Sequence, residues 1–115
     1  MSASLLKIRI NHEGNTALGP GKIELLQMIE LHGSISAAAK HMQMSYRRAW
    51  ELVDVMNRCF DQPVVQSTTG GTHGGGAQVT AFGKSLIAAY QQILHKSSQA
   101  AADELHLITQ HLKKT

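Results

Sequence analysis

SISAAAKHMQMSYRRAWELVDVMNRCF, residues 34–60, decides the fold of this 115-residue chain. Three consecutive alanines near its start favour a helix and are small enough for a second helix to pack closely. Met42 and Met44 flank Gln43 as apolar anchors around a tight turn, and Ser45 can cap the helix that follows. We therefore predict two helices joined by a turn.

The second of these helices has one apolar side. Its apolar residues recur every three or four positions and predict a buried stripe of Ala49, Leu52, Val53, Met56 and Phe60. The residues expected to face outward are Tyr46, Arg47, Arg48, Glu51 and Asp54. A helix with a cationic first turn opposite a buried stripe suits the major groove of DNA, so we interpret this stretch as a helix-turn-helix.

Several of these side chains have an alternative role. Arg47 and Arg48 can be a solvated pair, but their place between an alanine-rich helix and a glycine-rich segment favours contact with DNA. Trp50 can stack on a base, although its position beside the apolar stripe favours the core. Lys40 and Lys84 suit backbone contacts and ordinary surface positions equally.

The composition favours one mainly helical domain. Hydrophobic residues make up 43% of the chain and aromatic residues 4%, which predicts an aliphatic core. The formal net charge of +3 leans toward a polyanionic partner. Cys59 is the sole cysteine, so an intramolecular disulfide is excluded. Without an apolar signal segment or a membrane-spanning run, the sequence predicts a soluble, cytoplasmic protein with no membrane partner.

The sequence offers no pattern of catalytic or metal-binding residues. The histidines are scattered, and His106 and His111 would diverge on a helix. No carboxylate cluster or cofactor fingerprint is present. We therefore predict no enzyme activity, no metal and no cofactor.

Two elements are predicted before the helix-turn-helix. Residues 5–12, LLKIRINH, alternate between apolar and polar and predict a half-buried strand. A Gly-Pro-Gly turn precedes a predicted helix over residues 22–32, and Gly33 suits the left-handed end of that helix. Ser34 and Ser36 are both candidate caps for the next helix.

A hairpin is predicted after Pro63. Residues 64–69 and 78–80 favour strands, and the loop between them reads GGTHGGGA over residues 70–77. Glycines allow the backbone to approach a surface closely, and exposed N–H groups can bind phosphate oxygens, although a plain turn is the alternative. The loop lacks the GK[ST] ending of a P-loop, so we interpret it as a wing beside the helix-turn-helix.

The chain is expected to end in one long helix. Thr80 should cap a helix from Ala81 to about Lys113, ~50 Å in length. Because a domain of this size cannot cover such a helix, its apolar stripe is expected to pair with a second copy. The stripe consists of Leu86, Tyr90, Ile93, Leu94, Ala101, Leu105, Ile108 and Leu112. Packing on the chain's own core is the alternative, expected only for Leu86 and Ile87.

Two motifs carry a family resemblance that covers nearly the whole chain. They are Ser45-Tyr46 with Ala49-Trp50, and Thr69-Gly70-Gly71 with Gly74-Gly75-Gly76-Ala77 and Thr80. In this order they resemble the N-terminal DNA-binding domain of bacterial ModE-type molybdenum-responsive regulators, a winged helix related to the LysR type. The resemblance implies that the second helix reads DNA, the wing touches the backbone and the long helix dimerises. The candidate DNA contacts are Ser36, Lys40, Ser45, Tyr46, Arg47, Arg48, Thr69, Gly70, Gly71, Thr72, His73, Gly74 and Gly75.

Two departures from the family pattern limit what the resemblance implies. Wings of the family tend to carry a lysine within the glycine run, whereas Thr72 and His73 stand there in this chain, so a fixed charge becomes one that depends on protonation. This sequence is not expected to contain the C-terminal oxyanion-binding domain of the family. Molybdate sensing therefore does not transfer, and the sequence supports no oxyanion or other effector.

The sequence thus predicts a mainly α (α+β) fold, a winged helix-turn-helix over residues 1–80 and a dimerisation helix over residues 81–115. The predicted function is a homodimeric transcriptional regulator that binds double-stranded DNA at a pseudo-palindromic operator, with reading helices roughly 34 Å apart. The alternative is a dimerisation or adaptor module that forms mixed dimers with a full-length regulator.

Overall fold

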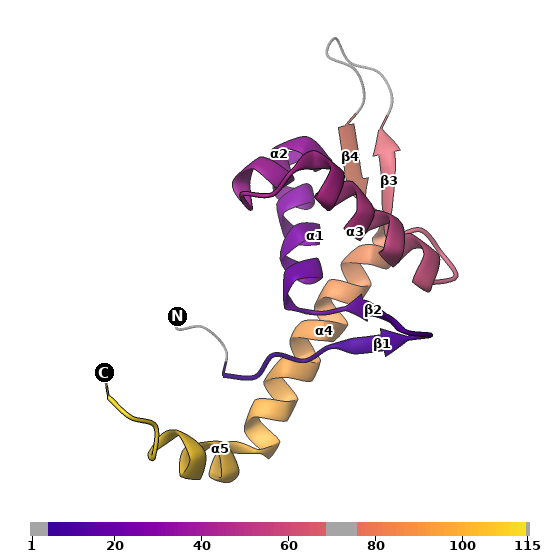
Figure 1. Cartoon of the computed structure of the whole chain (residues 1–115). Helices are drawn as coiled ribbons and strands as arrows, with labels where there is room; N and C mark the ends of the chain where they lie inside the picture. Colours follow the sequence, from indigo (N-terminus) through magenta and orange to yellow (C-terminus); the bar gives the residue numbers. More distant parts are fainter. Residues whose placement is uncertain (1–4, 69–75, 115) are drawn as a thin grey trace.

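Two small hairpins and five helices make up the part of the chain that the computed structural model describes, residues 5–68 and 76–114 (Figure 1). The strands pair antiparallel as β1 (Ile10–His12) with β2 (Asn15–Leu18), and β3 (Val65–Thr68) with β4 (Gly76–Val79). The helices are α1 (Pro20–His32), α2 (Ile35–His41), α3 (Tyr46–Cys59), α4 (Ala81–Ala100) and α5 (Ala102–Thr109). A helix-turn-helix, α2 and α3, followed by a hairpin is the predicted winged arrangement, so the fold class is confirmed.

Local chemistry sets where the helices begin and end. Ser34, Ser45 and Thr80 each accept a hydrogen bond from the backbone N–H three residues later and so cap α2, α3 and α4. Gly33 ends α1 at φ 78°, in the left-handed region that glycine adopts freely. Gln43 reaches φ 57° in the turn between α2 and α3, where other helix-turn-helix units use glycine. The sequence had predicted the caps of the three helices and the left-handed end of α1 at Gly33.

The core is aliphatic, as the composition indicated. Helix α1 lies at its centre and contacts α2, α3, α4 and β4. The side chains of Leu25, Leu26 and Ile29 are fully buried on α1 and meet those of Ala49 and Met56 on α3. Because the second hairpin and the first half of α4 complete this core, the position of α3 is fixed from several sides.

The N-terminal segment differs from the strand predicted over residues 5–12. Only Ile10–His12 is a strand, and it turns through Glu13 and Gly14 to pair with β2, a hairpin that the sequence did not predict. Residues 5–9 are irregular, and the buried hydroxyl of Tyr90 donates a hydrogen bond of 2.5 Å to the Ile8 carbonyl. Helix α4 therefore anchors the start of the chain.

The prediction of one continuous C-terminal helix is wrong. The helix breaks at Ala101, where φ is −104° and ψ is 19°, and α5 follows at an angle to α4 (Figure 1). No proline or glycine causes the break, but Asp103 and Glu104 lie in the first turn of α5, where negative charge is favourable. Placing Tyr90 at a dimer interface is also wrong, because this side chain is only 2% exposed within its own chain.

Helix α4 can cross the second hairpin closely only because residue 83 is glycine. A Cβ built there would lie 2.5 Å from the Val64 carbonyl oxygen and 2.6 Å from Val79 Cγ1. We expect Gly83→Ala to lower the free energy of unfolding by about 1–3 kcal/mol, measured by urea denaturation. Gly21→Ala in α1, where a Cβ meets open space, should leave stability equal or higher. Equal stability of the two variants would contradict this packing.

Candidate nucleic-acid interface

The outward face of α3 carries paired charges. Ala49, Val53 and Met56 are buried, so the opposite side of the helix faces solvent. There Arg47 lies 3.6 Å from Glu51, and the Arg47 side chain is 88% exposed. About three turns beyond Arg47, Arg58 lies 3.0 Å from Asp54. Exposed pairs of this kind are worth about 0.2–1 kcal/mol, so Arg47 can exchange Glu51 for another acceptor at little cost.

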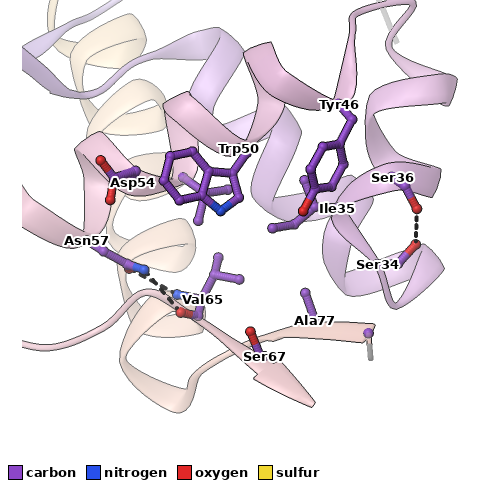
Figure 2. A pocket seen from close by; sticks show the side chains of 12 residues that line it. Ser34, Ile35, Ser36, Tyr46, Trp50, Asp54, Asn57, Val65, Ser67 and Ala77 are labelled. Atoms are coloured by element: carbon purple, nitrogen blue, oxygen red, sulfur yellow. Dashed lines mark hydrogen bonds between the residues drawn. The ribbon is translucent and has the colours of Figure 1, made fainter. Parts of the chain in front are cut away.

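Two aromatic side chains stand on the flank of α3 that faces the second hairpin. Trp50 is 48% exposed and Tyr46 55% exposed, and both line an open pocket of about 380 Å³ between α3, the start of α2 and β3–β4 (Figure 2). The prediction that Trp50 belongs to the core is wrong. The stripe through Ala49 and Val53 fills the buried side, and position 50 is rotated about 100° away from Ala49.

Arg47 and Arg48 diverge, although they are adjacent in the sequence. Arg47 lies on the outermost face of α3, whereas Arg48 lies on the flank away from Trp50 and lines a different cleft with Lys22. A step of about 100° per residue places positions 48 and 50 on nearly opposite flanks. The two arginines can therefore meet different groups of a ligand.

The remaining predicted contacts have distinct surroundings. The Ser45 hydroxyl already accepts a hydrogen bond as the cap of α3. Ser36 is exposed and lines the same pocket as Tyr46 and Trp50, with its hydroxyl 3.5 Å from that of Ser34. Lys40 is exposed in the last turn of α2. The predicted wing contacts lie outside the described residues, namely Thr69, Gly70, Gly71, Thr72, His73, Gly74 and Gly75.

Asn57 is a positioning residue that the sequence analysis missed. Its Oδ1 accepts hydrogen bonds from the N–H groups of Val64 (2.7 Å) and Val65 (3.3 Å), and its Nδ2 donates to the Val65 carbonyl at 3.2 Å. Asn57 thereby ties β3 to the helix that carries the exposed arginine and aromatic side chains. The only feature of the sequence that could have indicated this role is that Asn57 is a polar residue next to the apolar stripe of α3.

Removing the Asn57 amide should loosen the second hairpin. We expect Asn57→Ala to lower the free energy of unfolding by about 1–3 kcal/mol, because it leaves partly buried backbone groups without partners. Urea denaturation measures this loss. The control is Asn57→Asp, which keeps the oxygen acceptor and should lose less. Equal losses in both variants would contradict the role assigned to Oδ1.

Other classes of site find no support in the described part of the chain. None of its helices is long and apolar enough to cross a membrane. Its His, Cys, Asp and Glu side chains form no group of three able to hold a metal ion. His32 and His41 stack with ring centroids 3.8 Å apart and thereby join the ends of α1 and α2.

No protein-family model matches the chain, but individual proteins do. The chain is 39% identical over 101 residues to the molybdenum transport protein ModE of Azotobacter vinelandii, covering 88% of this chain and 37% of that protein. It is 42% identical over 86 residues to the DNA-binding transcriptional dual regulator ModE of Escherichia coli K12, covering 75% and 32%. Thus the chain spans about a third of the length of these curated relatives.

Solved structures share the fold at low sequence identity. The CbnR_DBD–DNA complex superimposes with a TM-score of 0.56 at 15% identity, covering 76% of this chain and 95% of that one. A LysR family transcriptional regulator gives a TM-score of 0.52 at 14% identity, covering 72% and 27%. These matches agree with the winged helix-turn-helix fold.

Proposed function

We propose that this chain, which is homologous to the amino-terminal region of the ModE proteins, is a sequence-specific DNA-binding module that regulates transcription. The observation that carries the proposal is the exposed face of α3. It presents Arg47, Tyr46 and Trp50 around the start of a helix that its own core holds firmly. In helix-turn-helix proteins the first residues of the second helix contact base edges. Helix α3 then enters the major groove with its N-terminal turns.

Each exposed side chain of α3 suits a particular contact. Arg47 can leave its weak pair with Glu51 and donate two hydrogen bonds to the O6 and N7 atoms of a guanine. Tyr46 and Trp50 offer rings to bases or sugars on the flank toward the second hairpin. The loop between β3 and β4, with Thr69–Gly75, is proposed to meet the backbone as the wing.

A homodimer through α4 and α5 completes the proposal. None of the α5 residues is buried, and Ile108 and Leu112 are 60% and 63% exposed. A helix of eight residues is unstable in water without packing, so this apolar surface needs a cover. A second copy supplies one, with contributions from exposed Ile93 and Leu107 and from the partly buried residues Leu86, Leu94, Ala101 and Leu105.

The same apolar surface favours a second candidate function. If α5 pairs with the corresponding helix of a full-length regulator, the chain is an adaptor that forms mixed dimers. A pull-down of that regulator, with no retention of the chain on duplex DNA at low salt, would support the adaptor and oppose the first proposal.

Selection from a random duplex pool tests the first proposal. Repeated capture on the immobilised chain should enrich an inverted repeat whose half-sites lie about one helical turn, roughly 34 Å, apart. Enrichment of a single unrepeated site would retain DNA reading but contradict the dimer. A pool that remains random after selection would reject sequence-specific binding.

A further inference from the structure

A second, strongly basic cleft lies on the other flank of α3. It measures about 540 Å³ and is formed by the N-terminal segment, β2, the first turn of α1 and the flank of α3. Its cations are Lys7 and Arg9 from the N-terminal segment, Lys22 from α1 and Arg48 from α3. Residues from far apart in the sequence thus place four positive charges around one opening.

The positive charge of this cleft is not balanced by the protein. No Asp or Glu lines it, and its four cations take part in none of the ion pairs found among residues 5–68 and 76–114. Arg47 and Arg58 on the outer face of α3 behave differently, since each has a carboxylate partner. An unbalanced group of cations around a cleft favours an external anion.

Lys22 is a partly buried cation in the wall of the cleft. Its ammonium group donates a hydrogen bond to the Thr16 carbonyl. Burial lowers the pKa of Lys22, the nearby Cys59 sulfur opposes this by raising it, and the charge of Arg48 lowers it again by a smaller amount. A bound anion would compensate both positive charges.

The wall of the cleft is fixed by packing. The hydrogen bond from Tyr90 holds the Ile8 carbonyl between Lys7 and Arg9. The stem of Arg9 crosses Gly19, because a Cβ at residue 19 would lie 3.5 Å from Arg9 Cγ. Binding here therefore needs little ordering of the backbone, which lowers its entropic cost.

We propose that the cleft of Lys7, Arg9, Lys22 and Arg48 binds a backbone phosphate of the strand beside the groove that α3 reads. This inference rests on the proposed DNA-binding function. Arg48 follows Arg47 directly but points to the flank away from Trp50, so with Arg47 over the bases Arg48 faces the sugar-phosphate backbone. Figure 1 shows hairpin β1–β2 and hairpin β3–β4 on opposite sides of α3. The cleft on one side of α3 and the wing on the other then contact the DNA backbone at the two edges of the groove.

The test measures the salt dependence of binding for Arg9→Gln and for the double variant Lys7→Gln, Arg9→Gln. Fluorescence anisotropy gives affinities for the selected duplex and a scrambled duplex over a chloride series. Each lost phosphate contact should reduce the slope of log affinity against log salt by about one, equally on both duplexes. The ratio of the two affinities should stay unchanged. Arg9→Lys, which keeps the charge, should retain the slope.

Lys113→Gln is the matched control, since Lys113 is exposed beyond α5. If the glutamine variants keep the wild-type slope while the wild type still prefers the selected duplex, the cleft proposal fails and the proposed function stands. If the wild type binds both duplexes equally, both proposals fail. A second measurement asks whether the cleft binds free phosphate instead: the melting temperature of the protein is compared in inorganic phosphate and in chloride at equal ionic strength. Stabilisation by phosphate that Arg9→Gln abolishes, with unchanged slopes on DNA, would overturn the backbone assignment.

Discussion

Arg47→Ala is expected to remove most of the sequence discrimination of this chain while leaving it folded. A bidentate arginine–guanine contact is worth about 1–3 kcal/mol, or roughly 5- to 150-fold in affinity, and a dimer would lose it in both half-sites. The melting temperature should hardly change, because the Arg47–Glu51 pair is exposed. Anisotropy with the selected and the scrambled duplex measures the loss, which should fall on the selected duplex.

Arg58→Ala is the matched control for Arg47→Ala. Arg58 has the same type of i, i+4 carboxylate pair but lies three turns further along α3, away from the end expected to meet the bases. Loss of the Arg58 side chain should hardly change the ratio of the affinities for the selected and the scrambled duplex. A similar fall in discrimination for both variants would mean that α3 does not enter the groove by its N-terminal turns. Unchanged discrimination in Arg47→Ala would remove Arg47 from the reading surface.

Replacing Ile108 and Leu112 together by glutamate is expected to produce folded monomers. Both side chains are exposed in the single chain, so their charge costs little there but is buried at a dimer interface. In a dimer, binding of one subunit to its half-site makes binding of the second subunit intramolecular. A monomer lacks this advantage, so its affinity for the inverted repeat should fall by about 10²–10⁴-fold. Light scattering after size exclusion gives the mass, and anisotropy gives the affinity.

Leu31→Glu is the control for this dimer variant. Leu31 is an exposed leucine near the end of α1, outside the apolar surface of α4 and α5. It should leave both mass and affinity unchanged. A dimer that persists in the Ile108 and Leu112 variant would place the interface elsewhere, and monomers with full affinity would make dimerisation irrelevant to binding.

The sequence predicted best what is decided locally. Caps at Ser45 and Thr80 and the left-handed Gly33 depend on a few neighbouring residues, so they could be identified without a structure. The stripe of Ala49, Val53 and Met56 likewise follows from helical spacing alone. Together with the glycine-rich hairpin, these features were sufficient to predict the winged helix-turn-helix fold.

What the sequence did not predict depends on contacts between distant residues. Trp50 is exposed because smaller side chains already fill the space beneath α3, which no local pattern records. The bond from Tyr90 to the Ile8 carbonyl joins residues 82 positions apart and replaces part of the expected strand. The break at Ala101 occurs in a run of good helix formers. The basic cleft required the same long-range information.

The central claim is that a dimer of this chain reads a DNA sequence with α3. Its most direct test is the affinity of the unmodified chain for the selected inverted repeat and for a scrambled duplex, measured by fluorescence anisotropy over a salt series. We predict tighter binding to the inverted repeat at every salt concentration, with both affinities falling steeply as salt rises. Equal affinity for the two duplexes would contradict the claim.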